Sequence, residues 1–325
     1  MATIPFPRYV VFGEALTDMI RQDDGSWRAM PGGSCWNVAR VGARLGVPTG
    51  FAGAVSMDMF GDDLERMGNE AGLDRRFLQR VDALPFLAMV TSKNPPSYFF
   101  IGENSADLQF DPALLPEGWL RAAEVIHVGS LSLARQPLAA RLVEQAIAAH
   151  RAGKRIAFDP NMRQHMDTAQ YQETFRLLAS IASYIKVSDE DLEGLFPGLS
   201  PAQGLTALRQ LAPGAEILLT RGAAGMSLLR GDSVWEQPAF RVEVADTVGC
   251  GDAAMAGWMS SLLLFPGSAP ARHLQTIAAV AALAATRAGP YAPCRDEVAL
   301  LLNQRKQGAS ASSIQVCQLA SLANH

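Results

Sequence analysis

The sequence predicts an α/β fold in which a mostly parallel sheet is sandwiched between helices. Short runs of β-branched or aromatic residues alternate with longer helical patterns along most of the 325 residues, and no repeat or linker divides the chain. Strands separated by helices favour a parallel sheet with both faces covered. A chain of this length, 49% hydrophobic, buries enough surface to need no disulfide or metal.

The expected elements follow in order along the chain. Strands are predicted at 9–13, 49–55, 125–129, 155–158, 184–187 and 216–219. Helices are predicted at 35–45, 62–71, 138–151, 169–182, 190–195 and 202–211. From residue 120 onward strand and helix alternate regularly, as expected for a parallel sheet.

Two segments break this alternation, because they are rich in β-formers and contain no crossover helix. We expect residues of about 14–32 and 86–110 to form a small antiparallel sheet inserted into the main domain. The main domain would occupy 1–303. Residues 304–325 are rich in Ser, Ala and Gln and are interpreted as a frayed helix or a mobile tail.

Composition and charge exclude several classes of function. The net charge is −4 and no Lys/Arg-rich block occurs, which argues against nucleic acid or an anionic membrane as partner. The longest apolar run found, 277–285, is far shorter than the ~20 residues that span a bilayer, and no secretory signal is visible. The histidines lack metal-ligand spacing; His127 is expected in a buried strand and the others at the surface. The four cysteines are widely scattered: Cys35, Cys250, Cys294 and Cys317. Their spacing supports neither a disulfide framework nor a zinc site, and it suits a reducing cytoplasm.

The heptapeptide from Asp246 to Asp252, DTVGCGD, is the most informative motif. It follows an expected strand at 240–245 and precedes an expected helix at 253–265. Gly249 and Gly251 allow consecutive N–H groups to point outward at a helix start, where the helix dipole favours an anion. Asp252 beside such a site is suited to deprotonating a hydroxyl group. The alternative interpretation is an ordinary helix N-terminus with a first-turn Asp.

Competing motifs fit less well. Gly249-x-Gly251-x-x-Ala254 matches the dinucleotide fingerprint but lacks the following βα unit with a ribose-binding acid. The sequence contains neither a Walker loop nor a Gly-x-Ser-x-Gly hydrolase elbow.

A second glycine pair, Gly32-Gly33, lies at a loop-to-helix junction. Adjacent glycines permit close approach of a small ligand, and Asn37 is placed to hydrogen-bond sugar hydroxyls. The alternative is a glycine turn in which Ser34 caps the helix. Asp18 follows the first strand, where ligand contacts gather in open α/β sheets.

Three further polar motifs stand at predicted strand ends: 159–163 (DPNMR), 186–191 (KVSDED) and 220–225 (TRGAAG). Arg163 could neutralise a phosphate. Ser188 is also a plausible helix N-cap, and 220–225 is either a hairpin turn or a loop under a nucleotide. No single one of these motifs indicates a ligand site, but their shared position at strand ends does.

With these residues established, the chain resembles the PfkB (ribokinase-like) family of sugar kinases over about residues 8–300. The two glycine motifs are similar to the two family signatures, in the same order. Cys250 stands where the family usually has Ala. Four stretches further resemble bacterial fructokinases: 13–18, 102–107, 159–163 and 186–191. The family's Asn-x-x-Glu element would fall on Ser188 and Asp191, and neither matches in identity.

The resemblance implies a ribokinase-like kinase domain with a small β-sheet lid, and roles for specific residues. Asp252 would be the base, assisted by Arg163 and the N–H groups of Gly249, Cys250 and Gly251. The sugar would contact Asp18, Gly32, Gly33, Asn37, Phe100, Arg163 and Asp252. ATP would lie near Asp159, Asn161, Lys186, Thr220, Gly222, Gly225, Gly249 and Gly251. Mg²⁺ would lie near Asp191, and a monovalent cation such as K⁺ near Asp246, Val248, Ala284 and Gly289. Pairing of lids into a homodimer is also implied.

The implied function is ATP-dependent phosphorylation of D-fructose to fructose 6-phosphate. Within the family the alternatives are 2-keto-3-deoxygluconate kinase, aminoimidazole riboside kinase and ribokinase. Asp18 argues against an acidic sugar, because two neighbouring carboxylates repel each other. A non-catalytic sugar- or nucleotide-binding relative is the alternative of a different class, and an intact Asp252 argues against it.

Overall fold

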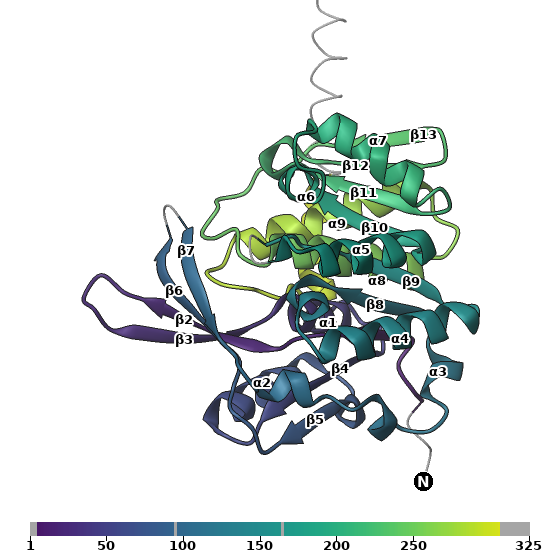
Figure 1. The fold of residues 1–325 in the computed structure, drawn as a ribbon. Helices are drawn as coiled ribbons and strands as arrows, with labels where there is room; N and C mark the ends of the chain where they lie inside the picture. Colours follow the sequence, from purple (N-terminus) through teal and green to yellow (C-terminus); the bar gives the residue numbers. More distant parts are fainter. Residues whose placement is uncertain (1–4, 94–95, 164–165, 306–325) are drawn as a thin grey trace, which may run out of the picture.

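Two sheets organise the protein (Figure 1). The structure, a computed structural model, describes residues 5–93, 96–163 and 166–305. The larger sheet has nine strands and is parallel from β5 through β11, after which β12 and β13 are antiparallel. Across the sheet the order is β13 (Ser233–Gln237), β12 (Met226–Arg230), β11 (Glu216–Thr220), β10 (Tyr184–Ser188), β9 (Arg155–Asp159), β8 (Val125–Gly129), β1 (Tyr9–Phe12), β4 (Thr49–Ser56) and β5 (Leu78–Val81).

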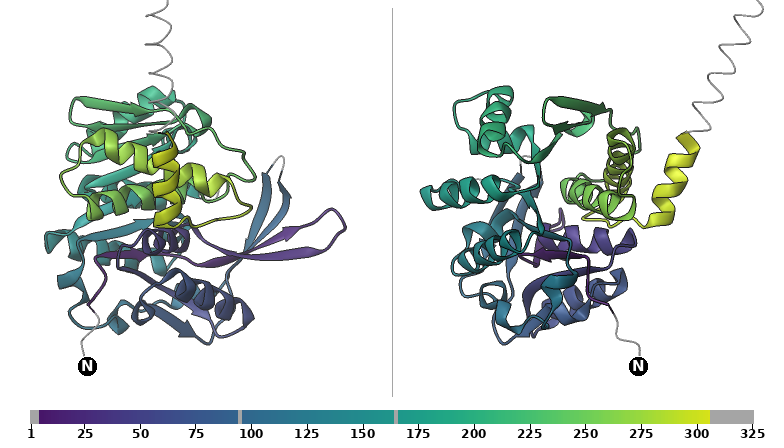
Figure 2. Two further views of the ribbon diagram at one scale, coloured as in Figure 1. Left: turned by 180° about the vertical axis from the view of Figure 1, so that it is seen from behind. Right: turned by 90° about the vertical axis from the view of Figure 1, so that its right-hand side faces the viewer.

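Helices cover both faces of this sheet, as the right-hand view of Figure 2 shows. Successive strand residues point to opposite faces, so Val10 and Phe12 enter one hydrophobic core while Tyr9 and Val11 enter the other. The first core also contains α4 (Leu138–Arg151), α5 (Ala169–Ile181), α6 (Asp189–Leu195) and α7 (Pro201–Leu211). The second contains α1 (Ser34–Arg44), α2 (Met59–Ala71), α8 (Cys250–Leu264), α9 (Pro270–Ala285) and the helix at 295–305. The predicted fold class is confirmed.

The smaller sheet projects from the body and is called the lid below (Figure 1). Its order is β3 (Trp27–Gly32), β2 (Leu16–Arg21), β6 (Leu87–Lys93) and β7 (Pro96–Ile101). The expected small sheet is present as two antiparallel hairpins, and these are joined through a parallel β2–β6 pair that was not expected. The lid strands end at Ile101, earlier than expected. Residues 102–110 form a loop and a 3₁₀ turn, and Phe110 is buried in the body.

Other differences occur around the heptapeptide from Asp246 to Asp252. The strand expected at 240–245 is absent from the described residues of that segment, and the N–H groups of Ala245 and Asp246 donate to the Ala285 carbonyl instead of to a neighbouring strand. Helix α8 begins at Cys250, three residues earlier than expected, because Gly249 serves as its N-cap with a left-handed backbone.

The remaining expectations divide as follows. His127 is buried in β8 as expected, whereas His273 was wrongly placed at the surface: it is buried and hydrogen-bonded to Ser261.

The C-terminal helix continues to residue 305, and the rest of the 304–325 tail lies outside the described residues. Within the described ranges, no helix has the length and apolar character needed to cross a membrane.

Candidate active site

The predicted polar motifs meet at one edge of the large sheet. The strands β1, β8, β9, β10 and β11 are parallel, so the segments that follow them leave at the same edge. The N-terminus of α8 lies there as well: a Cβ added to Gly251 would be 3.1 Å from Lys186 Nζ at the end of β10. The site is therefore assembled from segments that are far apart in sequence.

Asp252 lies in the first turn of α8 and is 8% exposed. Ser34 Oγ donates to its Oδ1 at 2.6 Å, and Asn37 Nδ2 donates to its Oδ2 at 2.9 Å. The interpretation of Ser34 as the helix cap is wrong, because the N-cap of α1 is Gly33 and no side chain caps it. The two glycine motifs are thus in direct contact through their polar side chains.

The two adjacent glycines pack closely against neighbouring segments of the protein. Gly33 has a φ of 104°, and an added Cβ would lie 2.8 Å from the Glu14 carbonyl. A Cβ on Gly32 would lie 2.9 Å from Asp18 Oδ2. These two positions leave room only for hydrogen, and they place Asp18 beside the start of α1.

Asp18 lies on the face of the lid that turns toward the body. The strand register places it in one row with Met30, Ala88 and Phe100, and residues in such a row point to the same side. Met30 packs against the loop after α9, since a Cβ on Gly289 would overlap Met30 Sδ at 2.1 Å. Asp18 and Phe100 therefore share the inner face of the lid.

The carboxyl group of Asp18 is held in an unfavourable environment for its charge. Burial, and to a smaller degree the charge of Asp252, raises the pKa of Asp18 to about 6. A carboxylate that lacks partners in a partly buried position is a good acceptor for incoming hydroxyl groups.

Among the described residues, two backbone N–H groups at the start of α8 lack a hydrogen-bond acceptor. The N–H of Cys250 donates to the Thr247 carbonyl at 3.2 Å, whereas those of Gly249 and Gly251 have no acceptor in the described part of the chain. Gly249 has a φ of 78°, and an added Cβ would lie 2.9 Å from Pro290 Cα. Two of the three expected donors are therefore available to an anion at the positive end of the helix.

A buried charged cluster lies next to this helix start. Lys186 Nζ is 3.1 Å from Asp159 Oδ2 and 4.0 Å from Asp191 Oδ2. Burial raises the pKa of Asp159 to about 7, although Lys186 acts in the opposite direction. Burial alone would lower the pKa of Lys186, but the two carboxylates outweigh it and raise that pKa. Lys186 is therefore charged at neutral pH.

Asp191 is engaged by the backbone on both oxygens. Its Oδ2 accepts from the N–H of Ser188 at 2.8 Å in a capping box, and its Oδ1 accepts from the N–H of Met162 at 2.7 Å. The described residues contain no cluster of three His, Cys, Asp or Glu side chains suited to a metal ion. Each carboxylate oxygen keeps a second lone pair, so Asp191 suits a water-mediated contact with a magnesium ion and not a direct ligand cage.

The remaining expected residues are placed as follows. Thr220 ends β11, and the turn to β12 carries Gly222 and Gly225, so this segment is a hairpin. Asn161 has a φ of 42° and its N–H donates to Asp159 Oδ1. Arg163 is half-buried and donates to the Met162 carbonyl. Among the residues that the structure describes, Arg163 has no hydrogen bond to the lid or to α8.

Asp246 ties two loops together near the inner face of the lid. Its Oδ1 accepts from the N–H of Val248 at 3.1 Å, and its Oδ2 accepts from the N–H of Gly289 at 2.9 Å. Ala284 lies in the last turn of α9, where its carbonyl accepts from Arg287. The four residues expected around a monovalent cation thus belong to two connected segments.

Sequence reasoning missed two residues of the site. Ser34 was given only a capping role. Glu14, which lies in the stretch 13–18 and was assigned no role, is 1% exposed and accepts from the N–H groups of Ser34 and Ser132. The Glu14–Ser34–Asp252 connection spans more than 200 residues of sequence and has no local signal.

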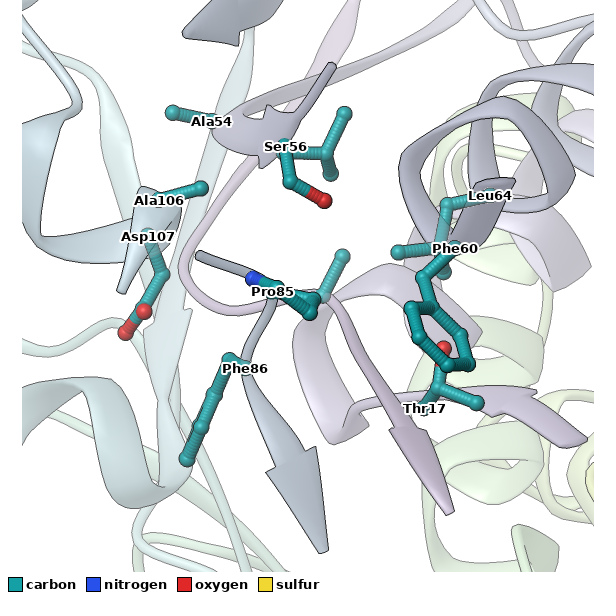
Figure 3. Close-up of a pocket in the computed structure, with 11 residues that line it drawn as sticks. Thr17, Ala54, Ser56, Phe60, Leu64, Pro85, Phe86, Ala106 and Asp107 are labelled. Atoms are coloured by element: carbon teal, nitrogen blue, oxygen red, sulfur yellow. The ribbon is translucent and has the colours of Figure 1, made fainter. Parts of the chain in front are cut away.

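A separate small pocket lies at the root of the lid (Figure 3). It contains none of the expected site residues. Its lining comes from β2, the end of β4, α2, the segment before β6 and the turn after β7: Ala15, Thr17, Ala54, Val55, Ser56, Phe60, Leu64, Pro85, Phe86, Ala106 and Asp107.

Comparison with known proteins agrees with this architecture. The chain is 29% identical over 299 residues to a fructokinase of Escherichia coli, covering 89% of this chain and 97% of that protein. Its structure matches the fructokinase of Xylella fastidiosa with bound ATP at a TM-score of 0.84 and 28% identity, covering 92% and 99% of the two chains. The fructokinase of Vibrio cholerae O395 in a form with fructose, ADP and calcium ion matches at a TM-score of 0.79 and 25% identity, covering 91% and 98%. The pfkB family carbohydrate kinase model matches residues 7–297, and the chain belongs to this family.

Proposed function

We propose that the protein transfers the γ-phosphoryl group of ATP to a hydroxyl group of D-fructose, forming fructose 6-phosphate. The observation that carries the proposal is the meeting of Asp252, the free N–H groups at the start of α8 and the inner face of the lid at one sheet edge. The fructokinases matched above support the choice of sugar.

In this mechanism Asp252 accepts the proton of the fructose hydroxyl as that oxygen attacks phosphorus, and ADP leaves. The N–H groups of Gly249 and Gly251 stabilise charge on the transferred group, with Cys250 contributing if its bond to Thr247 opens. Lys186 places a fixed positive charge next to these donors. Positioning and electrostatics of this kind account for most of the catalysis in phosphoryl transfer.

We infer that ATP lies along the carboxyl edge of the large sheet. The residues assigned to it lie on or just after β9, β10 and β11, or in the heptapeptide from Asp246 to Asp252: Asp159, Asn161, Lys186, Thr220, Gly222, Gly225, Gly249 and Gly251. A magnesium ion bound with ATP supplies charge neutralisation of the phosphates, and Asp191 would face it through water. A monovalent cation near Asp246, Val248, Ala284 and Gly289 is a further proposal, tested by comparing the rate in K⁺ and Na⁺.

The sugar is assigned to the space under the lid. Asp18 accepts from its hydroxyl groups, Phe100 packs against it from the same face, and Asn37 approaches from α1. Gly32 and Gly33 allow the sugar to approach the backbone closely. Arg163 is assigned to the transferred phosphate, which requires its side chain to turn away from Met162.

We also propose that two copies pair through the outer face of the lid. Trp27, Phe99 and Ile101 are 42%, 50% and 49% exposed and lie opposite to the Asp18 face by strand alternation. Exposed apolar patches of this kind favour association. Sedimentation should show a dimer that Phe99→Asp converts to monomers. The cytoplasm, which keeps thiols reduced, is the compartment we infer, since Cys35, Cys250 and Cys294 are all free.

A coupled assay with ATP and a panel of sugars tests the substrate. The space under the lid already contains the carboxyl group of Asp18, which disfavours an acidic sugar. We expect kcat/KM for fructose to exceed that for 2-keto-3-deoxygluconate by at least about a hundredfold, or about 2.7 kcal/mol. Ribose and aminoimidazole riboside complete the panel.

Two outcomes would change the proposal. A preference for the sugar acid would refute fructose while leaving the kinase intact. If Arg163→Ala weakened fructose binding but kept the wild-type kcat, the role of Arg163 would be sugar recognition and not phosphate transfer.

A further inference from the structure

The carboxylate of Asp252 is held on both oxygens by helix α1. Ser34 Oγ and Asn37 Nδ2 supply the two hydrogen bonds, at 2.6 and 2.9 Å. These residues are three positions apart, so they lie on the same face of the helix. Asn37 already has an expected role with the sugar, whereas no role follows for Ser34 from the family assignment or from the proposed function.

The Ser34 hydroxyl is free to reach Asp252 because another residue performs its expected capping task. A serine at a helix start usually accepts a hydrogen bond from a nearby backbone N–H. Here the N–H of Ser34 donates to Glu14 Oε1 at 3.1 Å, while Glu14 Oε2 accepts from the N–H of Ser132 at 3.2 Å. Glu14 therefore fixes the first turn of α1 against the segment after β8, and Ser34 is held in place.

We propose that Ser34 is a positioning residue that orients the carboxylate of Asp252 for proton transfer. The inference rests on the proposed function, in which Asp252 is the base. The carboxylate of an aspartate with one partner can rotate about its terminal bond, whereas two partners from one anchored helix fix its plane. Small misplacement of a reacting group costs large factors in rate. A hydroxyl also donates and accepts, so Ser34 can keep its contact after Asp252 takes up the proton.

The first test removes the hydroxyl. We expect Ser34→Ala to lower kcat about tenfold, with KM for fructose and ATP changed less than about twofold, as for an interaction that acts on the transition state. Ser34→Thr, which keeps the hydroxyl, should restore most of the rate. Ser261→Ala is the matched control: it removes a buried hydroxyl from the same helix as Asp252, bonded to His273, and should leave kcat unchanged.

The second test asks whether Ser34 acts through Asp252. On an Asp252→Asn background, adding Ser34→Ala should change the residual rate less than about twofold, because residues that act as one unit are not additive. A full tenfold loss on that background would show that Ser34 acts independently, and would overturn the inference. So would a wild-type kcat, or a raised fructose KM, in the Ser34→Ala single variant.

These outcomes are distinct from failure of the proposed function. If Asp252→Asn itself kept wild-type turnover, the assignment of the base would be wrong. If Asp252→Asn were inactive while Ser34→Ala were normal, the base would stand and the role of Ser34 alone would be refuted.

Discussion

The body and the lid contribute different groups to the site. The body supplies Asp252, the start of α8 and Lys186, and the central strands of its large sheet are buried along most or all of their length. The lid supplies Asp18 and Phe100 from strands that are partly exposed on both faces. In the proposed function, the body thus carries the groups that react, and the lid carries groups that contact the sugar.

This difference predicts a division in the kinetics. Interactions formed only in the transition state change kcat, whereas contacts made equally with bound substrate change KM. Substitutions in the body should therefore act mainly on kcat, and those on the inner face of the lid mainly on the KM for the sugar. Four experiments test this division, from the largest expected effect to the smallest.

Asp252→Asn should have the largest effect. Loss of the base should lower kcat about 10²–10⁴-fold, while fructose binding persists because Asn is nearly isosteric and can still pair with Ser34. The checks are steady-state kinetics and fructose binding by calorimetry. Near-wild-type turnover would remove Asp252 from the reaction.

Gly251→Ala should act on the same parameter through the helix start. The added methyl group would lie 3.1 Å from Lys186 Nζ, which is buried and cannot move freely because it is bonded to Asp159. Displacing the donors and the ammonium group should lower kcat about tenfold to a hundredfold. An effect confined to the KM for fructose would contradict the division.

Asp18→Ala, on the inner face of the lid, should act on the KM for fructose and not on kcat. Each charge-assisted hydrogen bond contributes about 1.5–3 kcal/mol, so loss of this acceptor should raise the KM for fructose at least about tenfold. KM for ATP should stay nearly unchanged. Asp24→Ala is the matched control, since Asp24 lies in the exposed turn of the same hairpin and bonds only locally to Ser26. A normal fructose KM in Asp18→Ala would exclude Asp18 from the sugar site.

The pH dependence of fructose binding should give the smallest effect. The pKa of Asp18 is raised to about 6 by burial, so the free enzyme loses the charged acceptor as the pH falls below that value. Since the charged fraction of Asp18 falls about tenfold between pH 7 and pH 5, we expect kcat/KM for fructose to fall by at most about tenfold from this group. Asp18→Asn should lack this component of the profile.

The same pKa predicts the sign of a stability change in the free protein. Because the folded pKa lies above the ordinary value of 3.8, the folded state binds more protons between about pH 4 and 6 than the unfolded state. The free energy of unfolding should therefore fall as the pH rises through that window. Urea unfolding of wild type and Asp18→Asn at pH 4 and pH 7.5 measures it. A wild-type stability that rose relative to Asp18→Asn over this range would contradict the raised pKa.

Much of the fold followed from local patterns. The helix over 138–151 and the strand over 125–129 were predicted with the observed bounds, because apolar periodicity is a local property. The segment 240–245 was predicted wrongly, since β-forming residues indicate extended backbone but not a partner strand. The parallel pairing of β2 with β6 was missed for the same reason: it joins two hairpins that are distant in sequence.

The sequence alone determined the layered α/β architecture, the two glycine motifs and the set of polar residues at strand ends, because each depends on the order and spacing of neighbouring residues. The tertiary structure decided which of these residues meet. It placed Ser34 and Asn37 on Asp252, engaged Asp191 in a capping box and bonded Arg163 to the Met162 carbonyl. Such contacts depend on how α1 packs against α8 and how the lid is joined to the body, and no local pattern specifies that packing.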